Sequence, residues 1–380
     1  MTGTGRRTLT RGQGSFRRGE VEREGRVAGY VLKAVRNTTG LTQDRLAERL
    51  GVDTTTVQGW ESGRRPLIAI SMADYLCLRQ ALLRLDAEPW LLRQLDVALE
   101  ADRFLGYVLG ADGPIDIENH PLATWVITRS FTDLVGWAIS GKPPAVLADV
   151  VRGTRRGPAP SGPQLAVGER RHVVDHLRTA AEQAAPDTVI GALLLRQAHY
   201  IAGFDATPET TEWLAAMLRR EQRRLRPDQW SPSWAVVRSG AHTLARQGDA
   251  EALPRFIRDH IAADECEVAN LNYWSYWIGE LSDPQLSDLF MIKQELGSWR
   301  GDRLLEHLVA RLDAANPYVD VVAHTLWSLL SLKGETVTAP CDKALTTAVQ
   351  RLFDEGSISS QSRRELQEVL YALRAMHHRG

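Results

Sequence analysis

The side chains best suited to binding a metal ion lie in one segment with helical spacing. His172, Asp175 and His176 fall at positions i, i+3 and i+4, so a helix would place them on one face. The metal-binding helix of a metalloprotease needs a glutamate one residue after the first histidine, and Val173 stands there. We therefore predict no metal site and no cofactor.

The sequence also lacks the loops with which enzymes hold phosphates or activate a serine. It contains neither a Walker loop nor a nucleophile elbow, and its early glycines do not stand between a strand and a helix. We therefore predict that the protein is not an enzyme.

Residues 270–280 carry four aromatic side chains and two amides in about three helical turns. One interpretation is that these aromatics form a core with neighbouring helices. The other is that they line a groove that binds a peptide or a small-molecule effector. The residues expected to line that groove are Asn270, Tyr273, Trp274 and Trp277.

Residues 29–50 contain the signals of two helices. The first helix covers residues 29–36 and ends near Gly40, which can supply the positive φ of a helix C-terminus. Thr42 can cap a second helix over residues 42–50, because its hydroxyl accepts from exposed backbone N–H groups.

A sharp turn and a third helix follow. Gly51 is free to make the turn, Val52 is expected to plug the core, and Asp53 can cap a helix over residues 54–61. A fourth amphipathic helix closes this core with Met72, Tyr75, Leu76 and Leu82.

This order of features resembles the Cro and phage-repressor (XRE-like) family of helix-turn-helix proteins. The resemblance covers about 60 of the 380 residues and is specific, because the cap, the small residue, the turn glycine, the plug and the inward pair all fall at the family's offsets. It rests on Arg36, Gly40-Leu41-Thr42-Gln43, Leu46-Ala47, Leu50-Gly51-Val52, Val57, Trp60-Glu61 and Gly63-x-Arg65-Pro66.

The resemblance implies that the third helix enters the major groove of duplex DNA. Its outward positions, Thr54, Thr55, Gln58 and Gly59, should then approach base edges. Gly59 departs from the family, in which a side chain at this position often reads a base. Its absence leaves readout to the other three residues or allows the backbone to come closer. The alternative for the two threonines is a solvated first turn.

The resemblance also implies phosphate contacts and an ion pair. Gln43 looks like the family's phosphate-binding residue, assisted by the helix dipole. Arg64 and Arg65 suit neighbouring phosphates, with plain surface charge as the alternative. Arg36 and Glu61 match the positions where the family joins helices one and three by an ion pair, so we expect them to be structural.

Length, composition and charge bound the rest of the prediction. At 380 residues the chain exceeds one core, and a composition of 43% hydrophobic and 24% charged residues is typical of a soluble protein. The absence of a long apolar run predicts no membrane span, no secretory signal and a cytoplasmic location. Residues 1–66 hold 13 Lys or Arg against 7 Asp or Glu, whereas the whole chain has a net charge of −1. Positive charge therefore gathers where a nucleic acid would bind.

Breaks in the helical pattern predict the domain organisation. A flexible basic arm of residues 1–20 precedes a four- to five-helix DNA-binding module at 21–88, a helical connecting segment at 89–152 and a Gly/Pro-rich linker at 153–168. Residues 169–380 are expected to form a helical effector or dimerisation domain.

The expected fold class is all-α, because period-2 alternation of β-branched residues hardly occurs. Turn signals about 35 to 45 residues apart in the C-terminal part suggest tetratricopeptide-like helix hairpins, and an irregular helical bundle is the alternative. We expect helices near residues 169–184, 188–203, 208–225, 231–246, 249–262, 266–281, 284–295, 302–314, 318–333, 342–354 and 359–377.

These features predict a sequence-specific DNA-binding transcriptional regulator. Its expected partners are double-stranded DNA, a second copy of the chain in a homodimer, and a peptide or small-molecule effector. The rival interpretation is a helical scaffold or peptide receptor whose DNA module is accessory.

Overall fold

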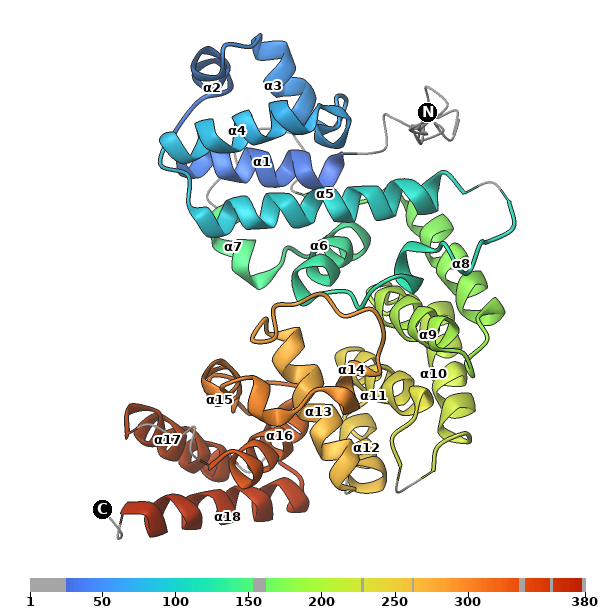
Figure 1. The fold of residues 1–380 in the computed structure, drawn as a ribbon, viewed down its shortest axis with the longest axis vertical. Coiled ribbons are helices and arrows are strands. Elements are labelled where there is room, and N and C mark those ends of the chain that lie inside the picture. Colours follow the sequence, from blue (N-terminus) through green and yellow to red (C-terminus); the bar gives the residue numbers. More distant parts are fainter. Residues whose placement is uncertain are drawn as a thin grey trace, which may run out of the picture. The chain divides into compact units, whose positions relative to one another are not determined.

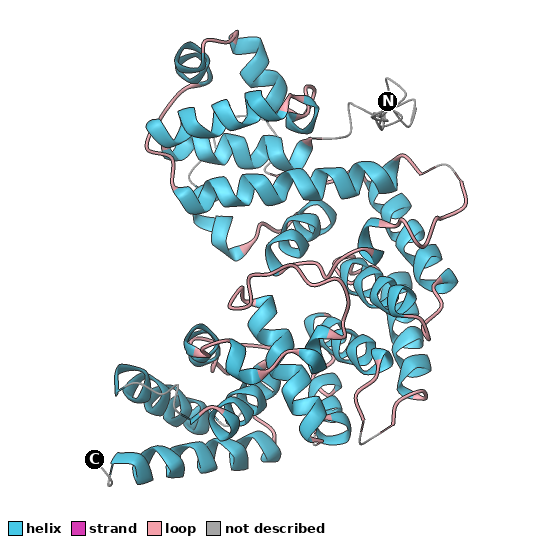
Figure 2. Ribbon diagram, in the orientation of Figure 1, coloured by secondary structure: helices cyan, strands magenta, loops and turns pink. Residues whose placement is uncertain are grey.

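The computed structural model describes residues 25–111, 113–152, 162–226, 229–261, 263–334, 339–355 and 358–377. Within these ranges every regular element is a helix and no strand occurs (Figure 2), which confirms the all-α prediction. The predicted basic arm at residues 1–20 lies outside the described residues. No described helix combines the length and the low polarity that crossing a bilayer requires.

The chain divides into two compact units. The N-terminal unit consists of residues 1–110 and 146–163, and the C-terminal unit consists of residues 111–145 and 164–380. This division differs from the predicted ranges at residues 89–152, because the first helix of that segment packs against the DNA-binding module.

Helices in close succession build the N-terminal unit (Figure 1). They are α1 (Arg26–Thr38), α2 (Gln43–Leu50), α3 (Thr54–Glu61), the 3-10 turn η1 (Leu67–Ala69), α4 (Met72–Arg84), α5 (Pro89–Leu109) and α7 (Ala145–Arg152). Helix α1 lies at the centre, because it packs against both α3 and α5.

A buried carboxylate of α5 holds the start of α1. Asp102 is 2% exposed, and its two oxygens accept hydrogen bonds from the backbone nitrogens of Val27, at 2.9 Å, and Ala28, at 2.8 Å. The first N–H groups of a helix have no partner within the helix, so this carboxylate replaces the missing cap. The module therefore extends through α5.

The C-terminal unit carries the remaining helices. They are η2 (Pro121–Ala123), α6 (Arg129–Ser140), α8 (Val167–Gln183), α9 (Val189–Ala202), α10 (Pro208–Gln222), α11 (Pro232–Arg246), α12 (Ala252–His260), α13 (Asp264–Trp277), α14 (Phe290–Lys293), η3 (Leu296–Ser298), α15 (Asp302–Val309), α16 (Val319–Leu332), α17 (Ala339–Glu355) and α18 (Ser360–His377).

Hydroxyl caps begin several of these helices where the turn signals stand in the sequence. Thr188, Thr207 and Ser231 each accept a hydrogen bond from a backbone nitrogen in the first turn of α9, α10 and α11. Helix α9 packs on α8 and α11, α11 also packs on α10 and α12, and α16 contacts α12, α13, α15 and α18. The helix pairs α8–α9 and α10–α11 fit either a helix-hairpin repeat or an irregular bundle.

Two predicted segments take a different form. Of the linker predicted at residues 153–168, residues 153–161 lie outside the described part of the chain. Leu165 is buried in the C-terminal unit, and its backbone nitrogen lies 2.9 Å from the Ala138 oxygen. The helix expected at 284–295 is limited to α14, because the Gln285 carbonyl accepts from the distant Val126 nitrogen at 2.7 Å instead of bonding within a helix.

Candidate functional site

The cap of α2 and the glycine that follows this helix have the geometry that their residue types predict. The Thr42 hydroxyl accepts from the Arg45 nitrogen at 3.2 Å, and Gly51 adopts the left-handed conformation with φ 67°. Asp53 occupies the position before α3, but its side chain makes no capping hydrogen bond. The glycine lets the chain reverse between the two helices without steric cost.

Arg36 and Glu61 form a buried, two-pronged ion pair between α1 and α3. Arg36 Nε lies 2.6 Å from Glu61 Oε1, and Arg36 Nη2 lies 3.0 Å from Glu61 Oε2. The Leu41 carbonyl accepts a further hydrogen bond from Arg36 Nη1 at 2.7 Å. Such parallel bonds fix orientation as well as distance, so the pair fixes the orientation of α3 relative to α1.

Gln43 belongs to the same network. Its amide Nε2 donates to Glu61 Oε2 at 2.7 Å, and the side chain is half-buried. The sequence predicts a phosphate contact for this side chain, whereas in the structure its amide joins α2 to α3. The backbone of Gln43 still begins α2, where the positive end of the helix dipole lies.

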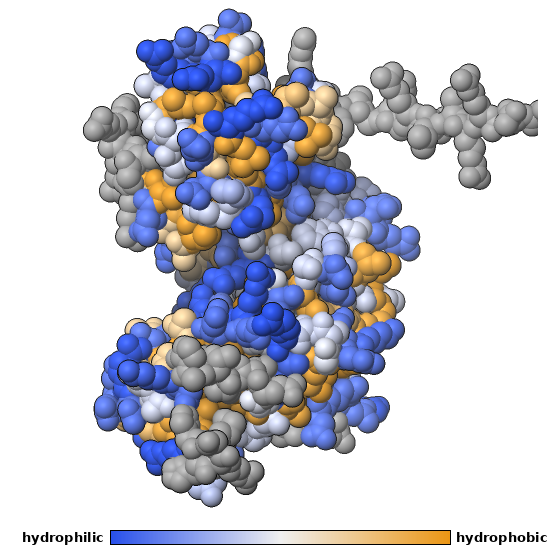
Figure 3. All heavy atoms as spheres, turned by 60° about the vertical axis from the view of Figure 1, so that its left-hand side comes forward, coloured by the Kyte–Doolittle hydropathy of each residue, from blue (hydrophilic) through white to orange (hydrophobic). Residues whose placement is uncertain are grey.

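The side chains at the start of α3 differ in exposure. Thr55 is exposed, Thr54 and Gln58 are half-buried, and Val57 on the inner face is completely buried. Hydrophilic side chains gather at the end of the unit that carries α2 and α3 (Figure 3). The outer face of α3 thus offers hydroxyl and amide groups, which can hydrogen bond to base edges.

Gly59 is buried rather than outward, because the side chain of Arg65 covers it. A Cβ atom at Gly59 would lie 3.0 Å from both Cγ and Cδ of Arg65, and the Arg65 nitrogen donates to the Gly59 carbonyl at 3.0 Å. The guanidinium continues to Thr56, whose hydroxyl lies 3.0 Å from Arg65 Nη1. The side chain of Arg65 therefore occupies the space on α3 that the missing side chain of Gly59 leaves open.

The neighbouring Arg64 behaves differently. It is exposed, and its Nε donates to the Ser62 hydroxyl at 3.1 Å beyond the end of α3. Arg65 thus lies along the outer face of α3, while Arg64 lies beside its C-terminal end.

The close approach of α1 and α3 depends on a glycine that the sequence analysis missed. A Cβ atom at Gly29 would clash with the Trp60 carbonyl oxygen and would lie 2.9 Å from the Glu61 carbonyl oxygen. The signal for this role is the position of Gly29 inside a helix, where glycine costs stability unless packing requires it.

Comparison with known families agrees with this geometry. A family model described as a helix-turn-helix domain matches residues 28–103, which run from α1 into α5 and make up about a fifth of the chain. Residues 28–103 form a helix-turn-helix domain. Neither the search of curated proteins nor the search of solved structures found a match. The helix-turn-helix assignment thus covers α1 to α5 and none of the C-terminal unit.

The aromatic segment predicted as an effector groove lies on α13, and most of it is buried. Asn270 is completely buried, and Tyr273 and Trp274 are 5% and 6% exposed. Trp277 is half-buried and stacks on Tyr273, with ring centroids 5.9 Å apart. Tyr273, Trp274 and Trp277 line a small pocket, whereas Asn270 lies in the core and hydrogen bonds to Arg238 and Thr325. This segment therefore contributes residues both to the hydrophobic core and to the lining of the pocket.

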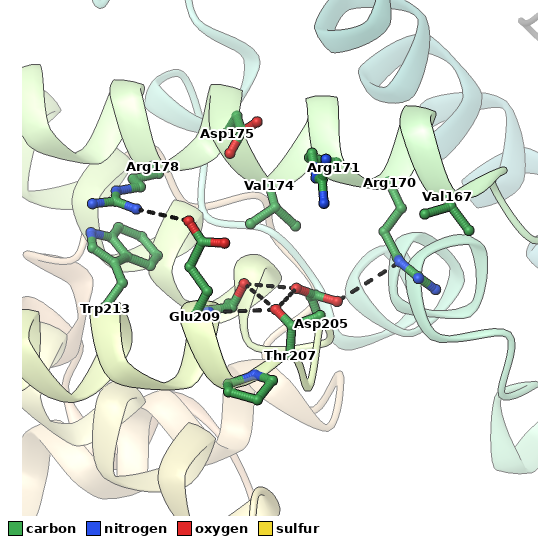
Figure 4. A pocket seen from close by; sticks show the side chains of 12 residues that line it. Val167, Arg170, Arg171, Val174, Asp175, Arg178, Asp205, Thr207, Glu209 and Trp213 are labelled. Carbon is green, nitrogen blue, oxygen red and sulfur yellow. Dashed lines mark hydrogen bonds and ion pairs between the residues drawn. The ribbon is translucent and has the colours of Figure 1, made fainter.

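A wider groove lies between α8 and α10 of the same unit (Figure 4). Two of its arginines are paired across the groove, with Arg170 3.8 Å from Asp205 and Arg178 3.8 Å from Glu209. The Asp205 carboxylate also accepts from the Thr207 hydroxyl at 2.6 Å. These contacts pair Arg170, Arg178, Asp205 and Glu209 among the lining residues.

The residues weighed as metal ligands do not converge. Asp175 lines the groove of Figure 4, His172 is exposed, and His176 is buried with its Nε2 3.2 Å from Nε2 of His120. Burial, and to a smaller extent the neighbouring His176, lower the pKa of His120 to about 3, and burial also lowers the pKa of His176, so this pair is neutral near pH 7. Within the described ranges, no group of three His, Cys, Asp or Glu side chains is arranged to hold a metal ion.

Proposed function

We propose that the protein is a sequence-specific DNA-binding transcriptional regulator of the Cro and phage-repressor type, with α3 in the major groove. The observation that carries this proposal is the pair α2–α3 inside the matched helix-turn-helix domain. One face of α3 is fixed to α1 by the Arg36–Glu61 ion pair, and the opposite face is accessible at Thr55. A rigidly held helix with an open polar face is what major-groove readout requires.

Base readout is assigned to Thr54, Thr55, Gln58 and Arg65. The Thr55 methyl group can contact a thymine methyl, and the Gln58 amide can pair with an adenine. Arg65 joins them because its stem follows α3 across Gly59, which brings its guanidinium beside Thr56. An arginine in the major groove pairs best with guanine.

Phosphate contact is assigned to Arg64 and to the start of α2. Arg64 is exposed beside the end of α3, where the flanking backbone of the duplex would run. At α2 the backbone N–H of Gln43 is the group we assign to a phosphate, because its side-chain amide is already bonded to Glu61. The excess of basic residues between positions 1 and 66 adds attraction that does not depend on DNA sequence.

We further propose a cytoplasmic homodimer. One helix-turn-helix module covers a half-site, so useful specificity calls for two copies on a two-fold symmetric operator. The C-terminal unit would then serve dimerisation, effector sensing or both.

The test is a selection from a pool of random duplexes with the full-length protein, followed by fluorescence anisotropy at two salt concentrations. We expect one enriched palindromic site, bound about 10³-fold or more tightly than random DNA. Thr55→Ala should change the enriched sequence, while Thr55→Ser should keep hydroxyl-dependent contacts and lose only methyl contacts. Arg93→Ala, on the exposed side of α5, is the matched control and should bind as the parent does.

Two results would overturn the proposal. One is binding that never exceeds the non-specific level, which would favour the helical scaffold or peptide receptor. The other is an enriched site that both Thr55 variants bind with the parent's preference, because α3 would then not be the reading helix.

A further inference from the structure

Three basic residues share one face of helix α11. Arg238, His242 and Arg246 follow one another at i, i+4 and i+8, so they form a row on the helix surface. Arg238 is only 2% exposed and belongs to the largest completely buried side chains of the protein. A buried charge is costly unless it is paired, so this row needs an explanation.

The guanidinium of Arg238 has no anionic partner within the part of the chain that the structure describes. Its Nε donates to Asn270 Oδ1 at 2.9 Å, and its Cζ lies 4.1 Å from the centre of the Tyr273 ring and 5.7 Å from that of Trp274. Its Nη2 is buried without a hydrogen-bond partner. Burial lowers the pKa of Arg238 to about 10, which still leaves the side chain charged at pH 7.

Other hydrogen-bonding atoms without partners are buried close by. They are Ser239 Oγ, His242 Nε2 and Trp274 Nε1, and all three residues line the same pocket as Arg238. Buried polar atoms are rarely left unsatisfied, so several around one pocket indicate a missing ligand or water. Together they can donate to the oxygens of one anion.

The surrounding charge is positive as well. Arg246, Arg311 and Arg129 act electrostatically on Asp133, and Arg246 also acts on Tyr200 and His242, which line the pocket. Arg246 lies over aromatic rings, with its Cζ 4.0 Å from the centre of Phe204, rather than against a carboxylate. Arg129 pairs with Asp133 at 3.5 Å, and Arg246 and Arg311 act on the same carboxylate, while Arg238 has no carboxylate partner among the described residues.

The size and lining of the pocket limit what can enter. The empty space in the pocket and its mouth is about 250 Å³. The volume within which the centre of a water-sized group can move is only about 20 Å³. The deep part therefore admits a single small head group, since about 10–15 Å³ of such space holds one water. Tyr200, Tyr273 and Trp277 surround it with ring faces and edges, which suit an organic acid better than a bare inorganic ion.

We propose that this pocket of the C-terminal unit binds a carboxylate group, with Arg238 as its charged partner and Ser239, His242 and Trp274 as further hydrogen-bond donors. The carboxylate belongs to a small organic acid or to the C-terminus of a peptide, because the same chemistry recognises both. The pocket is a site for an effector, and its occupation does not depend on DNA binding.

The experiment is calorimetric titration of the full-length protein, without DNA and at constant ionic strength, with sodium benzoate, with benzamide and with sodium phosphate. Benzoate and benzamide have nearly the same shape and differ in charge. We expect saturable binding of benzoate and none of benzamide or phosphate. Equal binding of benzoate and benzamide, tighter binding of phosphate, or no saturable binding of any carboxylate would each overturn the proposal.

Variants localise the binding. Arg238→Met keeps the buried stem and removes the charge, and it should weaken benzoate binding about 10- to 100-fold. Arg219→Met, an exposed arginine of α10, is the matched control and should bind as the parent does. If Arg238→Met does not fold, Trp274→Phe keeps the ring, removes one donor, and should weaken binding several-fold. Parent-like binding by a folded Arg238→Met, or by Trp274→Phe where it is used, would overturn the proposal.

A second arm identifies the source of the carboxylate. A glycine-rich tetrapeptide with a free C-terminus is compared with the same peptide amidated at its C-terminus. Competition of the free-acid peptide with benzoate supports a peptide terminus as ligand, and exclusion of both peptides while benzoate binds supports a small organic acid.

Discussion

The side chain of Arg65 lies across Gly59. Its Cγ atom is only 3.0 Å from the position that a Cβ atom of residue 59 would occupy. This packing buries the glycine and carries the guanidinium to Thr56 on the outer face of α3. An arginine beyond the end of the helix thus reaches the surface that a residue within the helix would otherwise occupy.

This relationship predicts different roles for adjacent arginines. Arg65→Ala should cost about 1–3 kcal/mol of binding free energy on the preferred site and relax its sequence at one position. Arg64→Ala should weaken binding to all duplexes alike and reduce the slope of log K against log salt by about 1. The measurement is anisotropy over a salt series with the selected and a scrambled duplex. A uniform loss from both variants would assign both arginines to phosphates.

Gly29 should resist even the smallest substitution. In Gly29→Ala the added methyl group meets the backbone carbonyls of Trp60 and Glu61, which cannot move aside as a flexible side chain would. We expect a loss of about 1–3 kcal/mol or more in the free energy of unfolding, measured by urea denaturation. Gly168→Ala, in the first turn of α8 with open space around its Cα, is the control and should leave stability nearly unchanged. Equal stability of the two variants would contradict the close approach of α1 and α3.

Removing the carboxylate that caps α1 should loosen the DNA-binding module. In Asp102→Ala the buried N–H groups of Val27 and Ala28 lose their acceptors, at about 1–3 kcal/mol for each donor left unsatisfied. Thermal unfolding and the helical circular dichroism signal report the loss. Glu100→Ala removes an exposed carboxylate from the same helix and should have a much smaller effect. The capping role is excluded if these two variants are equally stable.

A buried histidine should make the stability of the C-terminal unit depend on pH. His324 Nδ1 lies 2.9 Å from Glu365 Oε1, and its Nε2 lies 3.0 Å from Glu267 Oε1 as an ion pair without hydrogen-bond alignment. Burial alone would lower the pKa of His324, but the two glutamates that face its ring nitrogens outweigh burial and raise the pKa to about 9. The charged imidazolium is therefore the form that folding favours.

Because the pKa of His324 is raised in the folded state, the protein should become less stable as the pH rises. The stabilisation is fully present below the unfolded pKa of about 6.5 and is lost as the pH rises through about 9, with a total on the order of 3 kcal/mol. Urea denaturation at pH 6, 7.5 and 9 should show this fall in the parent. His324→Gln should be less stable at pH 6 and should lack the fall. A parent whose stability is flat over this range would rule out a charged His324.

The sequence by itself determined the helices and the helix-turn-helix domain, because their signals are local. Caps such as Thr42 and Ser231, turn residues such as Gly51, and apolar spacing act within one or two turns of chain. The helix expected at residues 231–246 is observed as α11, Pro232–Arg246. The same reasoning failed at residues 284–295, where Asp288 pairs with Arg196 at 2.7 Å and a distant backbone nitrogen takes the Gln285 carbonyl.

Only the tertiary structure decided which polar groups meet. Asp102 reaches Val27 across 75 positions of sequence, and Asn270 lies 32 positions from Arg238. The row of Arg238, His242 and Arg246 stands at helical spacing in the sequence, but the burial that makes it a candidate site comes from helices packed around α11. Pairing and desolvation depend on neighbours in space, and spacing along one helix cannot supply them.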